Sequence, residues 1–152
     1  FEEGLEVIRL LLTQDRSDFD GRYFRLQGAY CNPKPRQQPY PPITIGGRGE
    51  RRTMPLVAKY AQHWNFPGNS EDPFAEYQRL SGVLDDECAR IGRDPSAIVR
   101  SANVWPRDGL DAMARSVDRY AELGLDMVIV SMPRPLRVDD VFSIAKVLEA
   151  RR

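Results

Sequence analysis

From residue 43 onward, the sequence alternates short apolar segments with longer amphipathic ones. The short segments fall at 43–46, 63–66, 98–105 and 127–132, and each is followed by apolar residues at helical spacing. The predicted helices span about 53–62, 73–91, 110–121 and 138–149. Strand–helix units in series predict an α/β fold with a parallel sheet and right-handed crossovers. The uninterrupted apolar run 127–132 further predicts a strand buried on both faces.

Two architectures are built from such units, an open doubly wound sheet and the TIM (β/α)₈ barrel. A complete barrel takes about 250 residues. The chain has 152 residues, with room for four units, and it begins with Phe1 rather than methionine. We therefore expect a half-barrel, four βα units of a TIM barrel, folded as a single domain over 1–152. Residues 15–42 are expected to form an insertion within it, a hairpin followed by a proline-rich strap.

The segment before the first unit has its own local signals. Apolar residues at helical spacing predict a helix over 1–14. Asp20-Gly21, between aromatic residues, predicts a hairpin turn. Five prolines between residues 32 and 42 exclude a helix there and predict an extended connector.

The connection after segment 43–46 is unusually rich in glycine, with Gly46, Gly47 and Gly49 interleaved with arginines. Amides at a helix start have no partner within the helix, and glycines let the main chain approach a ligand closely. Arg48, Arg51 and Arg52 add positive charge, so the loop predicts a phosphate site. It is neither a spaced dinucleotide fingerprint nor a Walker loop. A plain strand-to-helix connection with solvated arginines is the alternative interpretation.

Pro55 limits where the helix after this loop can begin. Proline is tolerated in the first turn of a helix but damages its interior. The helix is therefore expected to start near Arg52 or Thr53, with Thr53 as a candidate N-cap.

Composition excludes several classes of function. Acidic and basic residues balance at 22 each, which argues against a dedicated binder of nucleic acid or of an anionic membrane. Apolar runs are too short to span a bilayer. With two distant cysteines and a single histidine, His63, we expect no metal site and a cytoplasmic location. His63 lies at a strand start, away from the usual catalytic end of a barrel, and is not expected to be catalytic.

At this point the chain resembles a known family. It is similar to the C-terminal half of the bacterial luciferase-like monooxygenases, and most similar to the branch that uses the deazaflavin coenzyme F420 rather than FMN. The resemblance rests on the order and spacing of FEEGLE (1–6), LLLT (10–13), DGRYF (20–24), CNPKP (31–35), PPITIGG (41–47), GERRT (49–53) and AQHWN (61–65).

The resemblance implies a barrel that binds coenzyme F420, or alternatively FMN, at the C-terminal ends of its strands. It implies that the cofactor phosphate lies on the loop after the fifth strand, and that the next strand ends near the cofactor. The residues that match these positions are Gly46, Gly47, Arg48, Gly49, Arg52, Thr53, Trp64 and Asn65. His63, where relatives often have an acidic residue, and Pro55 depart from the family pattern.

The family's substrate and ring-face groups come largely from strands that this chain lacks. We therefore assign no catalytic residue and expect the chain alone not to be a competent oxidoreductase on a small organic substrate. One alternative is a non-catalytic half-barrel that binds a partner or forms a homodimer, since open strand edges and an apolar inner face favour association. A fragment of a sugar-phosphate-binding barrel is a further alternative.

Overall fold

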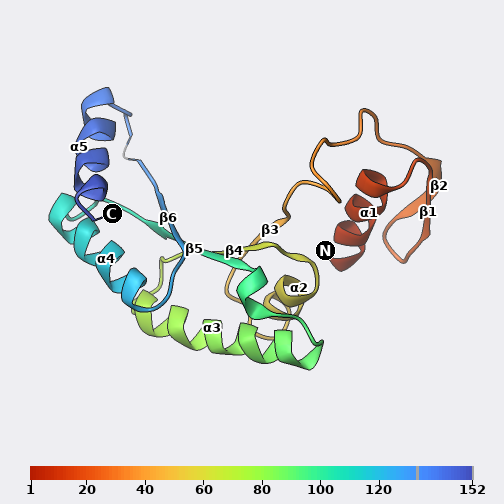
Figure 1. Ribbon diagram of the computed structural model, residues 1–152, viewed down its shortest axis with the longest axis horizontal. Helices are drawn as coiled ribbons and strands as arrows, with labels where there is room; N and C mark the ends of the chain where they lie inside the picture. The colour runs from red at the N-terminus through yellow and green to blue at the C-terminus, as the bar shows by residue number, and fades with distance from the viewer. Residues whose placement is uncertain (133, 152) are drawn as a thin grey trace. The chain divides into compact units, whose positions relative to one another are not determined.

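The computed structural model describes residues 1–132 and 134–151. The chain forms two compact units, Phe1–Ile43 and Thr44–Arg152 (Figure 1). The hairpin and the proline-rich strap both belong to the first unit, and all the predicted βα units belong to the second. A single domain over the whole chain stays a prediction.

The first unit consists of a helix and a two-stranded antiparallel hairpin. Its elements are α1 (Glu2–Thr13), β1 (Ser17–Asp20) and β2 (Arg25–Ala29). The Glu3 carboxylate of α1 accepts hydrogen bonds from the backbone amides of Arg22 (3.0 Å) and Tyr23 (2.8 Å) at the hairpin tip. A Cβ at Gly21 would lie 2.5 Å from a Glu3 oxygen, so a side chain at this turn would displace the Glu3 carboxylate. The predicted helix and hairpin are confirmed.

Residues 30–43 contain neither helix nor strand, which confirms that the proline-rich segment is not helical, but bends at 32–33 and 36–41 make it curved rather than extended. The connector is held to the end of α1 by Lys34, whose ammonium group donates to the carbonyls of Leu11 (2.7 Å) and Gln14 (2.6 Å). These carbonyls lie at a helix C-terminus, where intrahelical partners are lacking and positive charge is favourable.

The second unit is a four-stranded parallel sheet with a helix after each strand. Its strands are ordered β3-β4-β5-β6, as in sequence, without the reversal of a doubly wound sheet. This order confirms the predicted α/β fold with barrel-type topology. The elements are β3 (Thr44–Gly46), α2 (Thr53–Tyr60), β4 (His63–Phe66), α3 (Pro73–Arg90), η1 (Pro95–Ala97), β5 (Val99–Val104), α4 (Leu110–Glu122), β6 (Met127–Val130) and α5 (Val138–Glu149).

Helices α3, α4 and α5 follow one side of the sheet (Figure 1), and an aromatic cluster fills the space between. Trp64 of β4 stacks on Tyr77 of α3, with ring centroids 5.7 Å apart and planes 8° apart. Tyr77 in turn contacts Tyr120 of α4 edge-on at 5.6 Å. These buried rings place the core of the second unit between sheet and helices. Because side chains alternate along a strand, His63 and Asn65 point to the opposite, inner face.

Three local predictions are wrong. Strand β6 is not buried on both faces, since Met127 is 42% and Ile129 39% exposed on the inner side. It is the last strand of the sheet, and no described element of the second unit covers that face. The apolar spacing of the last predicted helix places Val141, Ile144, Ala145 and Leu148 on its inward face. In α5 Ile144 is buried, but Val141 is exposed. Thr53 is not the N-cap of α2, because Arg52 holds that position and Thr53 is the first helical residue.

Candidate functional site

The loop between β3 and α2, residues 46–53, opens at the carboxyl edge of the parallel sheet. All four strands point the same way, so the loops after β4, β5 and β6 meet at this edge as well. In barrel enzymes this is the edge that carries the active site. The structure therefore places the predicted phosphate loop where a barrel binds its ligand.

Gly47 is fixed from two sides by the neighbouring strand. Its amide donates to the carbonyl of Asn65 at 3.1 Å, and its own carbonyl accepts from the indole Nε1 of Trp64 at 2.9 Å. Its φ of 137° lies in the region that side chains disfavour. The chain therefore leaves the sheet at Gly47 in one defined direction.

The rest of the loop curls around the side chain of Thr53. The carbonyl of Gly49 accepts from the amides of Thr53 (2.8 Å) and Met54 (3.1 Å), which starts the first turn of α2. A Cβ at position 49 would lie 2.8 Å from Thr53 Oγ1, and one at position 47 would lie 3.2 Å from Thr53 Cγ2. Both glycines are needed because Thr53 occupies the inside of the loop.

Between these fixed points, the backbone amides of residues 48–52 are unpaired. None donates a hydrogen bond to any residue that the structure describes, whereas the amides of Gly47, Thr53 and Met54 do. The residues from Arg48 to Arg52 are exposed, so the loop offers a run of amides to solvent. Such a run before a helix N-terminus suits a phosphate dianion. The residues present therefore fit the phosphate of a flavin or deazaflavin cofactor.

The arginines of the loop differ in how they are engaged. The Arg48 guanidinium lies 3.5 Å from the Glu76 carboxylate of α3, in a half-exposed pair. Glu50, within the same loop, pairs with Arg79. Arg51 and Arg52 have no ionic partner in the described part of the chain. Arg52 immediately precedes α2, so its charge is better placed than that of Arg48 to meet an anion at the helix start.

Trp64 and Asn65, the two predicted site residues on β4, point in opposite directions. Trp64 is fully buried on the helix side and donates a hydrogen bond from its indole to the Gly47 carbonyl. It supports the loop from behind and offers no surface to a ligand. Asn65 is half-buried on the inner face, and a Cβ added at Gly46 would lie 3.9 Å from its Oδ1 atom. Asn65 is therefore the β4 residue that faces the mouth of the loop.

A hydrogen-bonded row of polar side chains crosses the inner face of the sheet. The Asn65 amide donates to Ser101 Oγ at 2.9 Å and to Asn103 Oδ1 at 3.4 Å. His63 lies 2.7 Å from Ser101 Oγ through Nε2 and 3.0 Å from Thr44 Oγ1 through Nδ1. A neutral imidazole protonated on Nδ1 satisfies the whole row, since Ser101 accepts from Asn65 and donates to His63.

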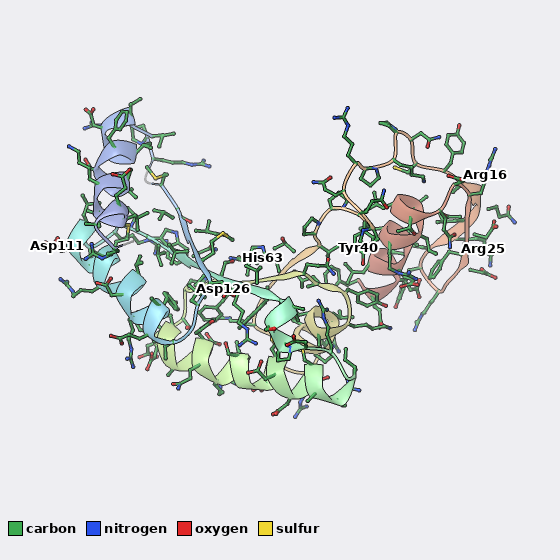
Figure 2. The ribbon with its side chains drawn as sticks, in the orientation of Figure 1. Arg16, Arg25, Tyr40, His63, Asp111 and Asp126 are labelled. Carbon is green, nitrogen blue, oxygen red and sulfur yellow. The ribbon has the colours of Figure 1, made fainter. Side chains whose placement is uncertain are left out.

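The protonation of His63 is set mainly by burial. Desolvation lowers the pKa of His63 below its usual value of 6.5, while the nearby Asp126 carboxylate acts in the opposite direction. Figure 2 shows these two side chains close together in the second unit. His63 is therefore neutral at pH 7, as the hydrogen-bonded row requires, and it serves to orient Ser101 and Asn65.

Ser101 and Asn103 were not predicted as site residues. The signal is the alternation within β5, where Ser101 and Asn103 lie two positions apart, between Ala102 and Val104, and so share one face. It becomes visible once 98–105 is taken as a strand with one face toward the helices. Which side chains of the neighbouring strands lie beside Ser101 and Asn103 depends on the register of strand pairing. Sequence alone does not provide that register.

Within residues 1–132 and 134–151, no group of three or more His, Cys, Asp or Glu side chains is arranged to hold a metal ion. No helix in the same part of the chain combines the length and apolar character that crossing a bilayer requires.

The chain belongs to the luciferase-like monooxygenase family, whose model matches residues 1–123. Among individual proteins, it is 29% identical to an F420-dependent glucose-6-phosphate dehydrogenase from Nocardia farcinica, covering 97% of this chain and 40% of the relative. It is 26% identical to an FMNH₂-dependent dimethylsulfone monooxygenase from Pseudomonas putida, covering 84% of this chain and 32% of the relative. The chain therefore spans less than half of these relatives.

Solved structures agree on the fold. An F420-dependent secondary alcohol dehydrogenase matches 99% of this chain with a TM-score of 0.81, at 16% identity, and 60% of its own chain is covered. The coenzyme F420-dependent tetrahydromethanopterin reductase of Methanopyrus kandleri matches 82% with a TM-score of 0.60, at 17% identity, and 39% of its chain is covered. The second unit thus corresponds to part of a TIM barrel, as predicted. The names of these relatives carry F420 and FMNH₂, the same two cofactors that the sequence resemblance implies.

Proposed function

We propose that this chain is the cofactor-phosphate-binding part of an F420- or FMN-dependent oxidoreductase that acts on a small organic substrate. The observation that carries the proposal is the run of unpaired amides at 48–52, between the fixed Gly47 and the N-terminus of α2. Membership of the luciferase-like family supports the oxidoreductase class, and F420 is the first candidate because the sequence most resembles the F420 branch. FMN is the alternative.

Each loop element has a distinct role in this proposal. The amides of 48–52 hold the phosphate oxygens, and the Arg52 guanidinium neutralises part of their charge. Arg48 contributes less, because Glu76 already shares its charge. Trp64 acts as a positioning residue by fixing Gly47. The bound cofactor supplies the redox chemistry, while the protein anchors and orients it.

Asn65 and Asn103 extend this site along the inner face. The Asn65 amide is committed to Ser101 and Asn103, which leaves its Oδ1 atom as an acceptor beside Gly46. The Asn103 amide nitrogen has no hydrogen-bond partner among the described residues. The pair therefore presents one acceptor and one donor to the part of the ligand that lies beyond the phosphate.

The test is a fluorescence titration of the chain with F420 and with FMN. We expect saturable binding of at least one, and Arg52→Ala should weaken it by about 1.5–3 kcal/mol, or roughly tenfold or more. Arg119→Ala is the matched control, because Arg119 is exposed on α4 and pairs with Glu122. Equal cofactor affinities of the Arg52→Ala and Arg119→Ala variants would show that Arg52 does not contact the phosphate. No binding of either cofactor would refute the proposal.

A second candidate function, self-association without catalysis, is favoured by the open inner face of the sheet. Val99, Met127 and Ile129 are 45%, 42% and 39% exposed on it, beside the polar row. A second copy of the chain would cover these side chains. Light scattering should then give a dimer or larger assembly, and a monomer of 17.4 kDa at high protein concentration would count against it.

A further inference from the structure

A cavity of about 310 Å³ lies at the carboxyl ends of β5 and β6, apart from the glycine loop. Its volume falls at the lower end of the range typical of small-molecule sites. It shares none of its lining residues with the loop after β3, but it opens at the same edge of the sheet. It is lined by Trp105, Pro106, Arg107, Ser131, Met132 and Arg134.

The charge of this cavity is entirely positive. Arg107 and Arg134 both line it, and none of the lining residues that the structure describes is acidic. Neither guanidinium has an ion-pair partner in the described part of the chain. Asp108 lines only the smaller neighbouring hollow of about 140 Å³. The cavity therefore presents two unpaired guanidinium groups, which favour a carboxylate or phosphate through charge-assisted hydrogen bonds.

The walls of the cavity suit the apolar body of a small molecule. The Trp105 ring is half-buried and holds the Arg107 guanidinium over its face at 5.1 Å from the ring centroid. Pro106 and Met132 add apolar surface, and Ser131 adds one hydroxyl. The Ser131 amide donates to the carbonyl of Val104 at 2.9 Å, which holds the ends of β5 and β6 together. A flat ring bearing an anionic group matches this combination.

We propose that the cavity binds a small organic carboxylate, with the carboxylate held by Arg107 and Arg134 and its apolar body against Trp105. The inference rests on the proposed function and deepens it by naming the chemical class of a second ligand group. In the proposed enzyme, the carboxylate belongs either to the substrate or to the cofactor bound at the glycine loop.

Isothermal titration of the chain with sodium benzoate tests the site without any cofactor. We expect saturable binding with a dissociation constant of about 1 mM or tighter. Arg107→Ala and Arg134→Ala should each weaken binding about tenfold or more, and Arg107→Lys by less. Arg115→Ala is the matched control, because Arg115 is exposed on α4 and lines neither hollow; it should leave the affinity unchanged.

Three results would overturn this proposal: no saturable heat, wild-type affinity in both cavity variants, or loss of benzoate binding in Arg52→Ala, which changes an exposed side chain of the glycine loop. The last would place the anion at the glycine loop instead. Because benzoate contains no cofactor group, failure of cofactor binding leaves this test intact, and the two proposals fail separately. Repeating the titration with saturating FMN or F420 then identifies the source of the carboxylate, since a cofactor that occupies the cavity displaces benzoate and a cofactor that leaves it open does not.

Discussion

Replacing Trp64 with phenylalanine tests whether the buried indole fixes the glycine loop. Trp64→Phe keeps an aromatic ring against Tyr77 but removes the Nε1 donor that bonds the Gly47 carbonyl at 2.9 Å. Leaving that carbonyl without its partner costs about 1–3 kcal/mol. The smaller ring also leaves a void at a fully buried site, which adds about 1–2 kcal/mol. We therefore expect the free energy of unfolding to fall by about 2–5 kcal/mol.

The assay is urea unfolding followed by far-ultraviolet circular dichroism, because the substitution removes a fluorophore. The second tryptophan provides the control. Trp105 is half-buried and its ring contacts the Arg107 guanidinium, so Trp105→Phe should cost no more than about 1 kcal/mol. If Trp64→Phe loses no more stability than Trp105→Phe, the bond to Gly47 does not hold the loop and the argument for Trp64 fails.

Three further predictions follow from local geometry. The pKa of His63, the only histidine, is lowered by burial, so its ring resonances should titrate below pH 6.5 in a proton NMR experiment. The contribution of His63 to folding stability is then complete above pH 6.5 and is lost as the pH falls through the lowered pKa. A titration midpoint of the His63 ring above pH 6.5 would contradict this. The pKa of Glu3 is lowered below 4.5, chiefly by the Tyr23 amide, so hydrogen-exchange protection of that amide should hold above pH 4.5 and decline as the pH falls through the lowered value. Protection of the Tyr23 amide that persists after Glu3→Ala at neutral pH would show that the Glu3 side chain does not hold this amide. Gly68→Ala would place a Cβ 2.4 Å from the carbonyl oxygen of Asn103 and should destabilise the chain, whereas Gly82→Ala meets nothing within 4 Å in the middle of α3 and should stabilise it by up to about 1 kcal/mol. Equal melting temperatures for these two variants would show that the close approach at Gly68 is absent.

Local sequence patterns were enough to locate most elements of the second unit. Strand β4 and helix α5 have the predicted bounds. Of the two capping residues that the sequence offers before α3, Ser70 and Asp72, it is Asp72 that accepts a hydrogen bond from the Ala75 amide. These features depend on periodicity and capping, which neighbouring residues determine. The start of α2 was predicted to within a residue for the same reason, since Pro55 had to lie in the first turn.

Features that depend on pairing between distant segments were missed. An apolar run does not show whether a strand lies inside a sheet or at its end, and so the exposure of Met127 and Ile129 was not anticipated. The same holds for the row formed by Ser101 and Asn65, which exists only because β4 and β5 pair in one register. At the glycine loop, the sequence predicted free amides, but only the paired structure shows that the Gly47 amide is already used.

The central claim is that the loop after β3 binds the cofactor through its phosphate. The most direct measurement compares the affinity of the chain for FMN with that for riboflavin, which lacks the phosphate, in the wild type and in Gly47→Val. The account predicts that FMN binds the wild type roughly tenfold or more tightly than riboflavin, and that Gly47→Val removes most of this difference without affecting riboflavin. Equal affinities for FMN and riboflavin in the wild type, or a difference that survives in Gly47→Val, would contradict it.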